Sequence, residues 1–151
     1  IGSAQPKLTY GITNTFRYKN FDLSFFLRGT IGNDILNATR MAYAQSGFLP
    51  GTNALDDPLT YTLSETPRFS NYYLEKGSFM RLDNLTLGYK IKALNGIRVY
   101  FTAQNLFVIT KYKGLDPEVP MDSGDGLTPG VEPREFYPKA PTFSVGLNLN
   151  F

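Results

Sequence analysis

The sequence predicts an all-β fold, a segment of a transmembrane antiparallel β-barrel, and three observations lead to this. Five segments alternate apolar and polar side chains, the pattern of strands that are apolar on one face only. These segments are about as long as the roughly ten residues that a tilted strand needs to cross a bilayer. The connections alternate short and long, as in outer-membrane barrels, which have short periplasmic turns and long extracellular loops.

Composition excludes several classes of site. The 151 residues include 10 Tyr, 12 Phe, 14 Gly and 10 Pro, which suits a β-rich chain with many turns. There is no Cys and no His, so disulfides, thiolate or imidazole metal sites and Cys-His or Ser-His catalysis are excluded. A net charge of +2 gives no reason to expect a nucleic-acid partner. No run approaches the ~18 apolar residues of a membrane helix.

The first two strands are expected at 7–18 and 21–31, joined by the short turn Lys19-Asn20. Each has one apolar face, broken only by Asn14 in the first strand, while Phe26 is the apolar exception on the polar face of the second. A long connection, 32–78, follows, with a short helix expected over about 35–45 and prolines beyond it. Connections of this length are usually functional loops or disordered segments.

The third strand is expected at 79–91, and its first half has the opposite phase to its second half. A β-bulge near Asp83 would reconcile the two halves. A short turn near 93–96 leads to the fourth strand, 97–109.

A second long connection, 110–141, is rich in Gly, Pro and Asp, and the closing strand is expected at 142–151. In that strand the apolar side chains occupy every odd position. They are Phe143, Val145, Leu147, Leu149 and Phe151.

Charge placement is compatible with a membrane barrel and with a soluble sandwich, whereas the alternation of loop lengths favours the membrane barrel. Outside the first half of the third strand, every strand charge falls on the polar face. An Arg or Lys facing lipid at mid-bilayer costs roughly 2–4 kcal/mol. Counting back from a periplasmic C-terminus puts both short turns on the periplasmic side, with Tyr18, Phe21, Tyr89 and Phe151 near that interface. Five strands cannot close a barrel, so we expect a C-terminal fragment of a larger barrel, or a chain whose partner supplies the rest.

Several motifs resemble one family. SFMRLDNLTLGYKI (78–91), RVYFTAQNLFVITKYKGLDPEV (98–119) and YPKAPTFSVGLNLNF (137–151) are similar to the C-terminal end of SusC/RagA-family TonB-dependent receptors. Upstream, PKLTYGITNTFRYKNFDLSFFLRGTIGNDILNATR (6–40) resembles the preceding hairpin of the same barrels. The resemblance covers most of the chain apart from the middle of the first long connection.

The resemblance implies a 22-stranded barrel in the outer membrane of a Gram-negative bacterium, with an N-terminal plug that this chain does not contain. It also implies a SusD-like surface lipoprotein as partner, the TonB complex as energy source through the absent N-terminal region, and import of oligosaccharides or peptides. In barrels of this kind the closing strand with its final Phe151 serves as the assembly signal.

No enzyme, cofactor or metal motif is present, and no substrate-binding residue can be named. The loop carboxylates Asp56, Asp57, Asp116 and Glu118 are interpreted as solvated loop charge, and MDSGDG (121–126) as a turn. Tyr112, Asp116 and Glu118 are candidates for loop structure. A set of polar-face residues is expected to face the barrel lumen: Arg17, Asp22, Arg28, Asn84, Thr86, Arg98, Thr102 and Gln104.

Two alternatives remain from the sequence. One is a soluble or surface-exposed β-sandwich that binds glycan or protein. The other is a different outer-membrane barrel, such as an adhesin or a lipase, although the missing His disfavours a lipase within this segment.

Overall fold

A computed structural model describes residues 2–47, 49–62, 67–91, 97–118, 129–132 and 137–149. The chain forms two compact units. The sheet unit comprises 8–30, 79–110 and 139–151, and the loop unit comprises 1–7, 31–78 and 111–138. No helix among the described residues is long and apolar enough to cross a membrane.

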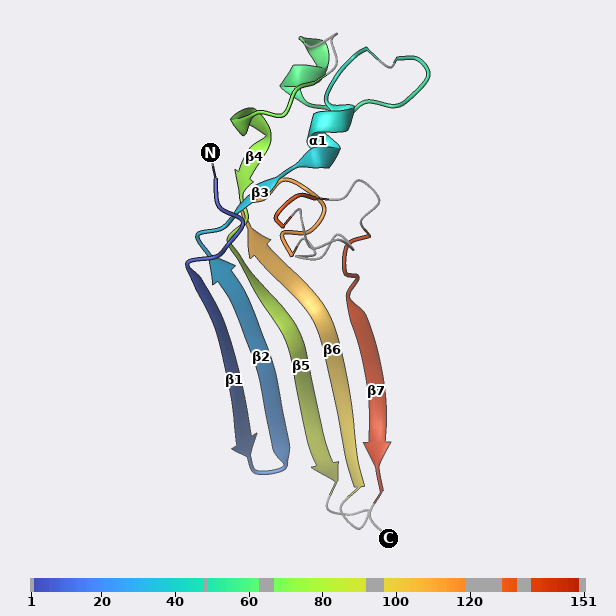
Figure 1. Cartoon of the computed structure of the whole chain (residues 1–151). Helices are drawn as coiled ribbons and strands as arrows, with labels where there is room; N and C mark the ends of the chain where they lie inside the picture. Colours follow the sequence, from blue (N-terminus) through green and yellow to red (C-terminus); the bar gives the residue numbers. More distant parts are fainter. Residues whose placement is uncertain are drawn as a thin grey trace. The chain divides into compact units, whose positions relative to one another are not determined.

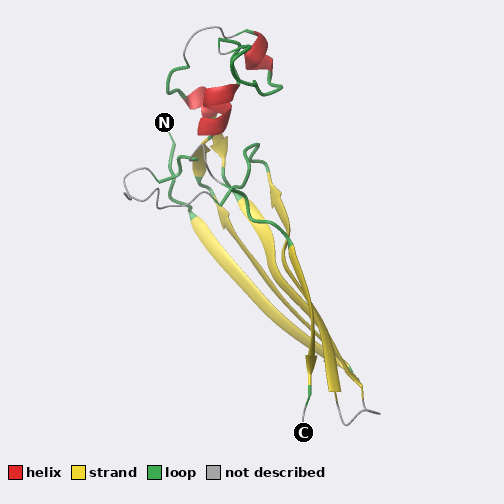
Figure 2. Ribbon diagram, turned by 90° about the vertical axis from the view of Figure 1, so that its right-hand side faces the viewer, coloured by secondary structure: helices red, strands yellow, loops and turns green. Residues whose placement is uncertain are grey.

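The sheet unit is one five-stranded sheet with the order β1-β2-β5-β6-β7 (Figures 1 and 2). From β2 to β7 the neighbouring strands pair antiparallel. The strands are β1 (Leu8–Tyr18), β2 (Phe21–Ile31), β5 (Phe79–Ile91), β6 (Ile97–Thr110) and β7 (Thr142–Asn148). The fold is therefore the all-antiparallel arrangement of a β-barrel segment.

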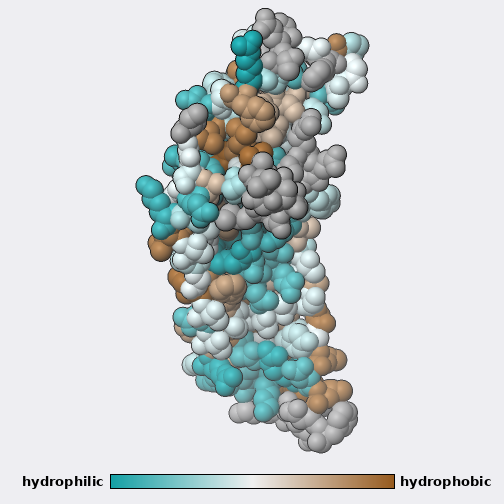
Figure 3. Space-filling view, in the orientation of Figure 1, coloured by the Kyte–Doolittle hydropathy of each residue, from teal (hydrophilic) through white to brown (hydrophobic). Residues whose placement is uncertain are grey.

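One face of the sheet is apolar across all the paired strands. The register places Leu23, Leu87, Phe101 and Val145 in one row, because cross-strand partners point to the same face. These side chains are not covered within the described part of the chain: Phe101 is 39% exposed and Val145 75%. Figure 3 shows the other face, where hydrophilic side chains cover the strands. The sheet thus has one apolar and one polar surface.

A β-bulge at Asp83 restores the phase of β5, as the sequence predicts. Phe26 pairs with Asn84 but Leu27 pairs with Leu82, so Asp83 has no partner in β2. Opposite the bulge, β6 has one residue more than β5 between the paired positions. Asn105 lies in this stretch, and its φ of 50° is in the left-handed region that Asn tolerates. As a result Leu82 returns to the apolar face and Arg81, opposite Arg28, to the polar face.

The loop unit contains structure that alternation could not reveal. A two-stranded sheet pairs β3 (Asp34–Leu36) with β4 (Leu74–Lys76), and Val131 adds a parallel bridge to Leu36. Two 3-10 helices, Pro58–Tyr61 and Asn71–Tyr73, lie between β3 and β4 along the chain. Ile35 and Tyr73, 1% and 4% exposed, are core residues of this unit.

The predicted helix over 35–45 is too long at both ends, because α1 spans only Ala38–Tyr43. Residues 34–36 are held in a strand instead, and Asn37 caps the helix by accepting the backbone N–H of Arg40 at 2.8 Å.

The remaining bounds differ slightly from the expected ones. β6 ends at Thr110 rather than 109, and β7 ends at Asn148 rather than 151. The expected turn at 93–96, the MDSGDG segment and Phe151 lie outside the described residues.

Candidate functional site

The polar face of the sheet brings together most of the residues that the sequence assigns to the lumen. Thr86 and Thr102 are register partners whose hydroxyls lie 3.1 Å apart, and Thr86 also donates to Asn84 Oδ1 at 3.3 Å. Gln104 is the register partner of Asn84. This part of the polar face is a row of neutral hydrogen-bonding groups, which is suited to contact with water.

Ion pairs lie at both ends of that neutral row. Arg98 donates to both carboxylate oxygens of Asp22, with Nε–Oδ1 at 2.9 Å and Nη2–Oδ2 at 2.5 Å. Arg28 Nη2 lies 3.1 Å from Asp83 Oδ1. The Asp83 pair was not predicted, because the residue falls where the alternation changes phase.

A hollow of about 370 Å³ on the sheet unit gathers positive charge. Arg17, Lys19, Lys90 and Arg98 line it together with the single carboxylate of Asp22. Lys90 and Arg98 are direct cross-strand partners. Lys19 and Lys90 are absent from the residues predicted for the site, although Lys90 could have been found from its place on the polar face.

In the loop unit, charged residues that the sequence interprets as solvated are paired. Arg40 Nε donates to Asp57 Oδ2 at 2.8 Å, and both side chains are only about 15% exposed. Hydrogen bonding from Arg40 holds the pKa of Asp57 below its usual value, and the same bond raises the pKa of Arg40. The interpretation of Asp57 as solvated loop charge is therefore wrong.

Glu75 joins three separate segments of the loop unit. Its carboxylate accepts Asn37 Nδ2 at 3.2 Å and the backbone N–H of Lys113 at 2.8 Å, and lies 3.6 Å from Arg40 Nη1. Nothing in the local sequence around Glu75 indicates this role, since its partners are 35 or more residues away.

A second carboxylate, Glu132, is completely buried in the same unit. It accepts backbone N–H groups from Thr39 at 3.4 Å and Leu115 at 3.2 Å. Burial, and then the neighbouring Glu132 charge, raises the pKa of Tyr112 far above its ordinary value. Since Thr39 and Glu132 lie in different long connections, their hydrogen bond ties the two connections to each other.

The candidates for loop structure lie in this packed region. Tyr112 is 6% exposed and Asp116 3%, and Asp116 Oδ1 accepts the backbone N–H of Glu118 at 2.9 Å. Asp116 is therefore buried rather than solvated, contrary to the interpretation from sequence. Its hydrogen bond closes a local turn of the kind that Asp side chains favour.

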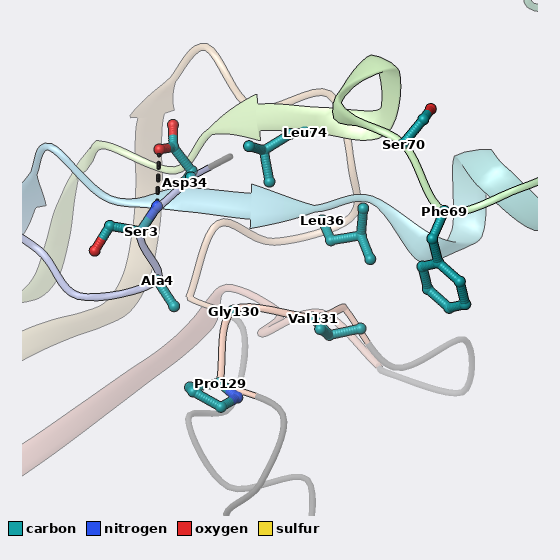
Figure 4. A pocket seen from close by; sticks show the side chains of 11 residues that line it. Ser3, Ala4, Asp34, Leu36, Phe69, Ser70, Leu74, Pro129, Gly130 and Val131 are labelled. Carbon is teal, nitrogen blue, oxygen red and sulfur yellow. Dashed lines mark hydrogen bonds between the residues drawn. The ribbon is translucent and has the colours of Figure 1, made fainter.

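A mostly apolar cleft of about 290 Å³ lies elsewhere in the loop unit (Figure 4). Leu36, Leu74 and Val131 line it, with the exposed ring of Phe69 at one end. Its one carboxylate, Asp34, accepts Ser3 N at 3.2 Å and Lys76 Nζ at 2.7 Å, and the Lys76 bond lowers the Asp34 pKa. The cleft therefore offers apolar contact rather than a charged group.

Metal chemistry has no support in the described part of the chain. No group of three or more Asp and Glu residues there is arranged to hold a metal ion, and the sequence has no His or Cys.

No family model matches the chain. It is 39% identical, over 93% of its length, to the TonB-dependent receptor SusC of Bacteroides thetaiotaomicron. It is 34% identical, over its full length, to the TonB-dependent receptor P3 of Formosa agariphila. The chain spans only 15% and 17% of those two proteins.

Solved structures agree in fold. The RagAB peptide importer in the closed-closed state matches 97% of the chain with a TM-score of 0.75 and 27% identity. The open-open state of the same importer matches with a TM-score of 0.69. In both cases the chain covers 17% of the matched chain.

Proposed function

Since this chain belongs to the SusC/RagA family of TonB-dependent receptors, we propose that it is part of an outer-membrane receptor for active nutrient import. It would form a section of the barrel wall and two extracellular loops. The observation that carries this proposal is the sheet with one uncovered apolar face and one polar face, which suits lipid on one side and water on the other.

The apolar face would contact lipid and the polar face would line the lumen. Arg17, Asp22, Arg28 and Arg98 then lie on the water-filled side, where charge carries no lipid penalty. The turn at Lys19-Asn20 would be periplasmic, and the connections 32–78 and 110–141 extracellular. The packed loop unit supports this assignment, because a defined loop structure is what recognition of a ligand or partner requires.

Partners and cargo are proposed from the relatives. A SusD-like surface lipoprotein would cover the receptor, and the TonB complex would act through the part of the receptor that lies outside this chain. The cargo would be an oligosaccharide or a peptide, and RagAB, a peptide importer, supports the second. This role requires no catalysis by the chain.

A role in barrel assembly is proposed for the closing strand. Phe143, Val145 and Leu147 share the apolar face of β7 and are all more than half exposed. With Leu149 and Phe151 they would form the alternating apolar pattern that the assembly machinery recognises.

The soluble β-sandwich is the competing proposal, and it requires a second sheet over the apolar face. Membrane fractionation of cells that express the full-length receptor separates the two. We expect the protein in the outer membrane, resistant to extraction by urea or carbonate. Recovery in the aqueous periplasmic or secreted fraction would refute the barrel.

A further inference from the structure

Two strand pairs of the sheet have no tight turn to set their register. Residues 32–78 separate β2 from β5, and residues 111–141 separate β6 from β7 (Figure 1). Register is determined by turn geometry only where the connection is short. The apolar alternation repeats every two residues, so a slip of two leaves both faces unchanged. Other contacts must therefore select one register.

Tyr100 makes such a contact on the polar face of β6. Its register partners on both sides are glycines, Gly88 on β5 and Gly146 on β7. The Tyr100 ring lies over Gly146: a Cβ on that residue would be 2.7 Å from ring atom Cε1 and closer still to the hydroxyl end. While the ring keeps this position, only a residue without a side chain fits opposite Tyr100.

Arg98, also on β6, makes a similar contact over the other glycine, Gly88 on β5. Its guanidinium crosses β5 to reach Asp22 on β2, so the ion pair joins two strands that are not neighbours. It passes over Gly88, where a Cβ would lie 2.6 Å from Arg98 Nε and 2.5 Å from Asp22 Oδ1. The guanidinium also lies 5.1 Å from the centre of the Tyr100 ring.

We propose that these five residues, Asp22, Gly88, Arg98, Tyr100 and Gly146, form a register belt that selects the alignment of β5 on β2 and of β7 on β6. A two-residue slip of β7 would place Ser144 or Asn148 opposite Tyr100, and either side chain would occupy the space of the ring. A two-residue slip of β2 would move Asp22 by about 6.6 Å along the strand and separate it from Arg98.

Cysteine pairs can measure the register directly, because the chain has no cysteine of its own. Thr102→Cys with Ser144→Cys reports the native register, in which these residues are partners. Thr102→Cys with Thr142→Cys reports a two-residue slip, since the two positions are then opposite and within disulfide reach. Both pairs are introduced into the full-length receptor and oxidised in outer membranes.

With the belt intact we expect cross-linking of 102 to 144 and little of 102 to 142. Gly146→Leu should abolish most of the 102–144 product, and adding Tyr100→Ala should restore it by vacating the ring's space. Tyr100→Phe, which keeps the ring, should behave like the parent.

Two results would overturn the belt. One is an unchanged cross-linking pattern in Gly146→Leu. The other is failure of Tyr100→Ala to rescue Gly146→Leu in a receptor where Tyr100→Ala alone assembles, because the defect would then not come from the ring.

Discussion

Individual charged residues of the loop unit have specific partners, and this could not be inferred from the local sequence. Asp57 lies 14 residues after the end of α1, and no sequence pattern relates it to Arg40, yet the two form a largely buried ion pair. Glu75 and Glu132 likewise accept hydrogen bonds from groups far away in sequence. Such contacts depend on tertiary folding, whereas alternation reports only which face a residue occupies.

The Arg40–Asp57 pair predicts a pH dependence of the loop unit. The folded pKa of Asp57 is lowered, so the pair's stabilising contribution is complete above the ordinary carboxyl pKa of about 4 and is lost as pH falls through the lower folded value. The protection factors for amide hydrogen exchange in residues 37–60, which correct for the slower intrinsic exchange at low pH, should therefore fall below about pH 4. Asp57→Asn should have lower protection factors at neutral pH, and they should change less on acidification. The same pH dependence of these protection factors in the parent and in Asp57→Asn would contradict a stabilising role of the Arg40–Asp57 pair.

Glu132 predicts a difference between two substitutions. Glu132→Ala leaves the partly buried backbone N–H groups of Thr39 and Leu115 without their acceptor, and the loss should cost at most about 1–3 kcal/mol for each group. Glu132→Gln keeps one acceptor oxygen and should cost less. Limited proteolysis within 111–118 measures the effect. We expect the fastest cleavage in Glu132→Ala, slower cleavage in Glu132→Gln and the slowest in the parent. Equal cleavage of all three would show that Glu132 does not tie the connections together.

At the level of elements, the strands could be predicted and the loop structure could not. Long alternating runs indicated all five strands, and the phase change at Asp83 indicated the bulge, because a period of two is readable over ten residues. β3 and β4 have three residues each, too few to show a period. The helix was overestimated for the same reason, since residues 34–36 carry no signal that they pair with a distant segment.

The two faces of β6 predict unequal effects of the same charge at adjacent positions. Phe101→Arg would place a cation on the apolar face, at roughly 2–4 kcal/mol near mid-bilayer, whereas Thr102→Arg would place it on the polar face. Heat-modifiable mobility of the receptor on SDS gels measures assembly. We expect loss of the folded band for Phe101→Arg only, and equal loss in both variants would contradict the face assignment.

The bulge predicts that deletion of its extra residue preserves the two faces of β5. Because Asp83 has no partner in β2, its removal leaves Leu82 next to Asn84 in regular alternation, with Arg81 still on the polar face. Removal of the paired residue Leu87 would instead reverse the faces of the residues on one side of the deletion. Folded receptor should be largely retained in the first deletion and lost in the second. Equal loss of folded receptor in both deletions would contradict the bulge at Asp83.

At the scale of the whole molecule, the chain spans about a sixth of the length of the curated relatives that it matches. The sequence was sufficient for the fold class and the family, because alternation, loop lengths and ordered motifs all occur within these 151 residues. Cargo recognition was not predictable in the same way. It would depend on side chains from parts of the receptor that lie outside the chain, together with loop contacts that form only on folding.

Site-directed labelling tests the central claim, a barrel wall with its long connections outside the cell, most directly. Phe69→Cys lies in the long connection 32–78 and is 78% exposed, whereas Asn20→Cys lies in the short turn after β1. In intact cells a membrane-impermeant maleimide should label Phe69→Cys, and should label Asn20→Cys only after the outer membrane is opened. Labelling of both in intact cells, or of Asn20→Cys alone, would contradict the account.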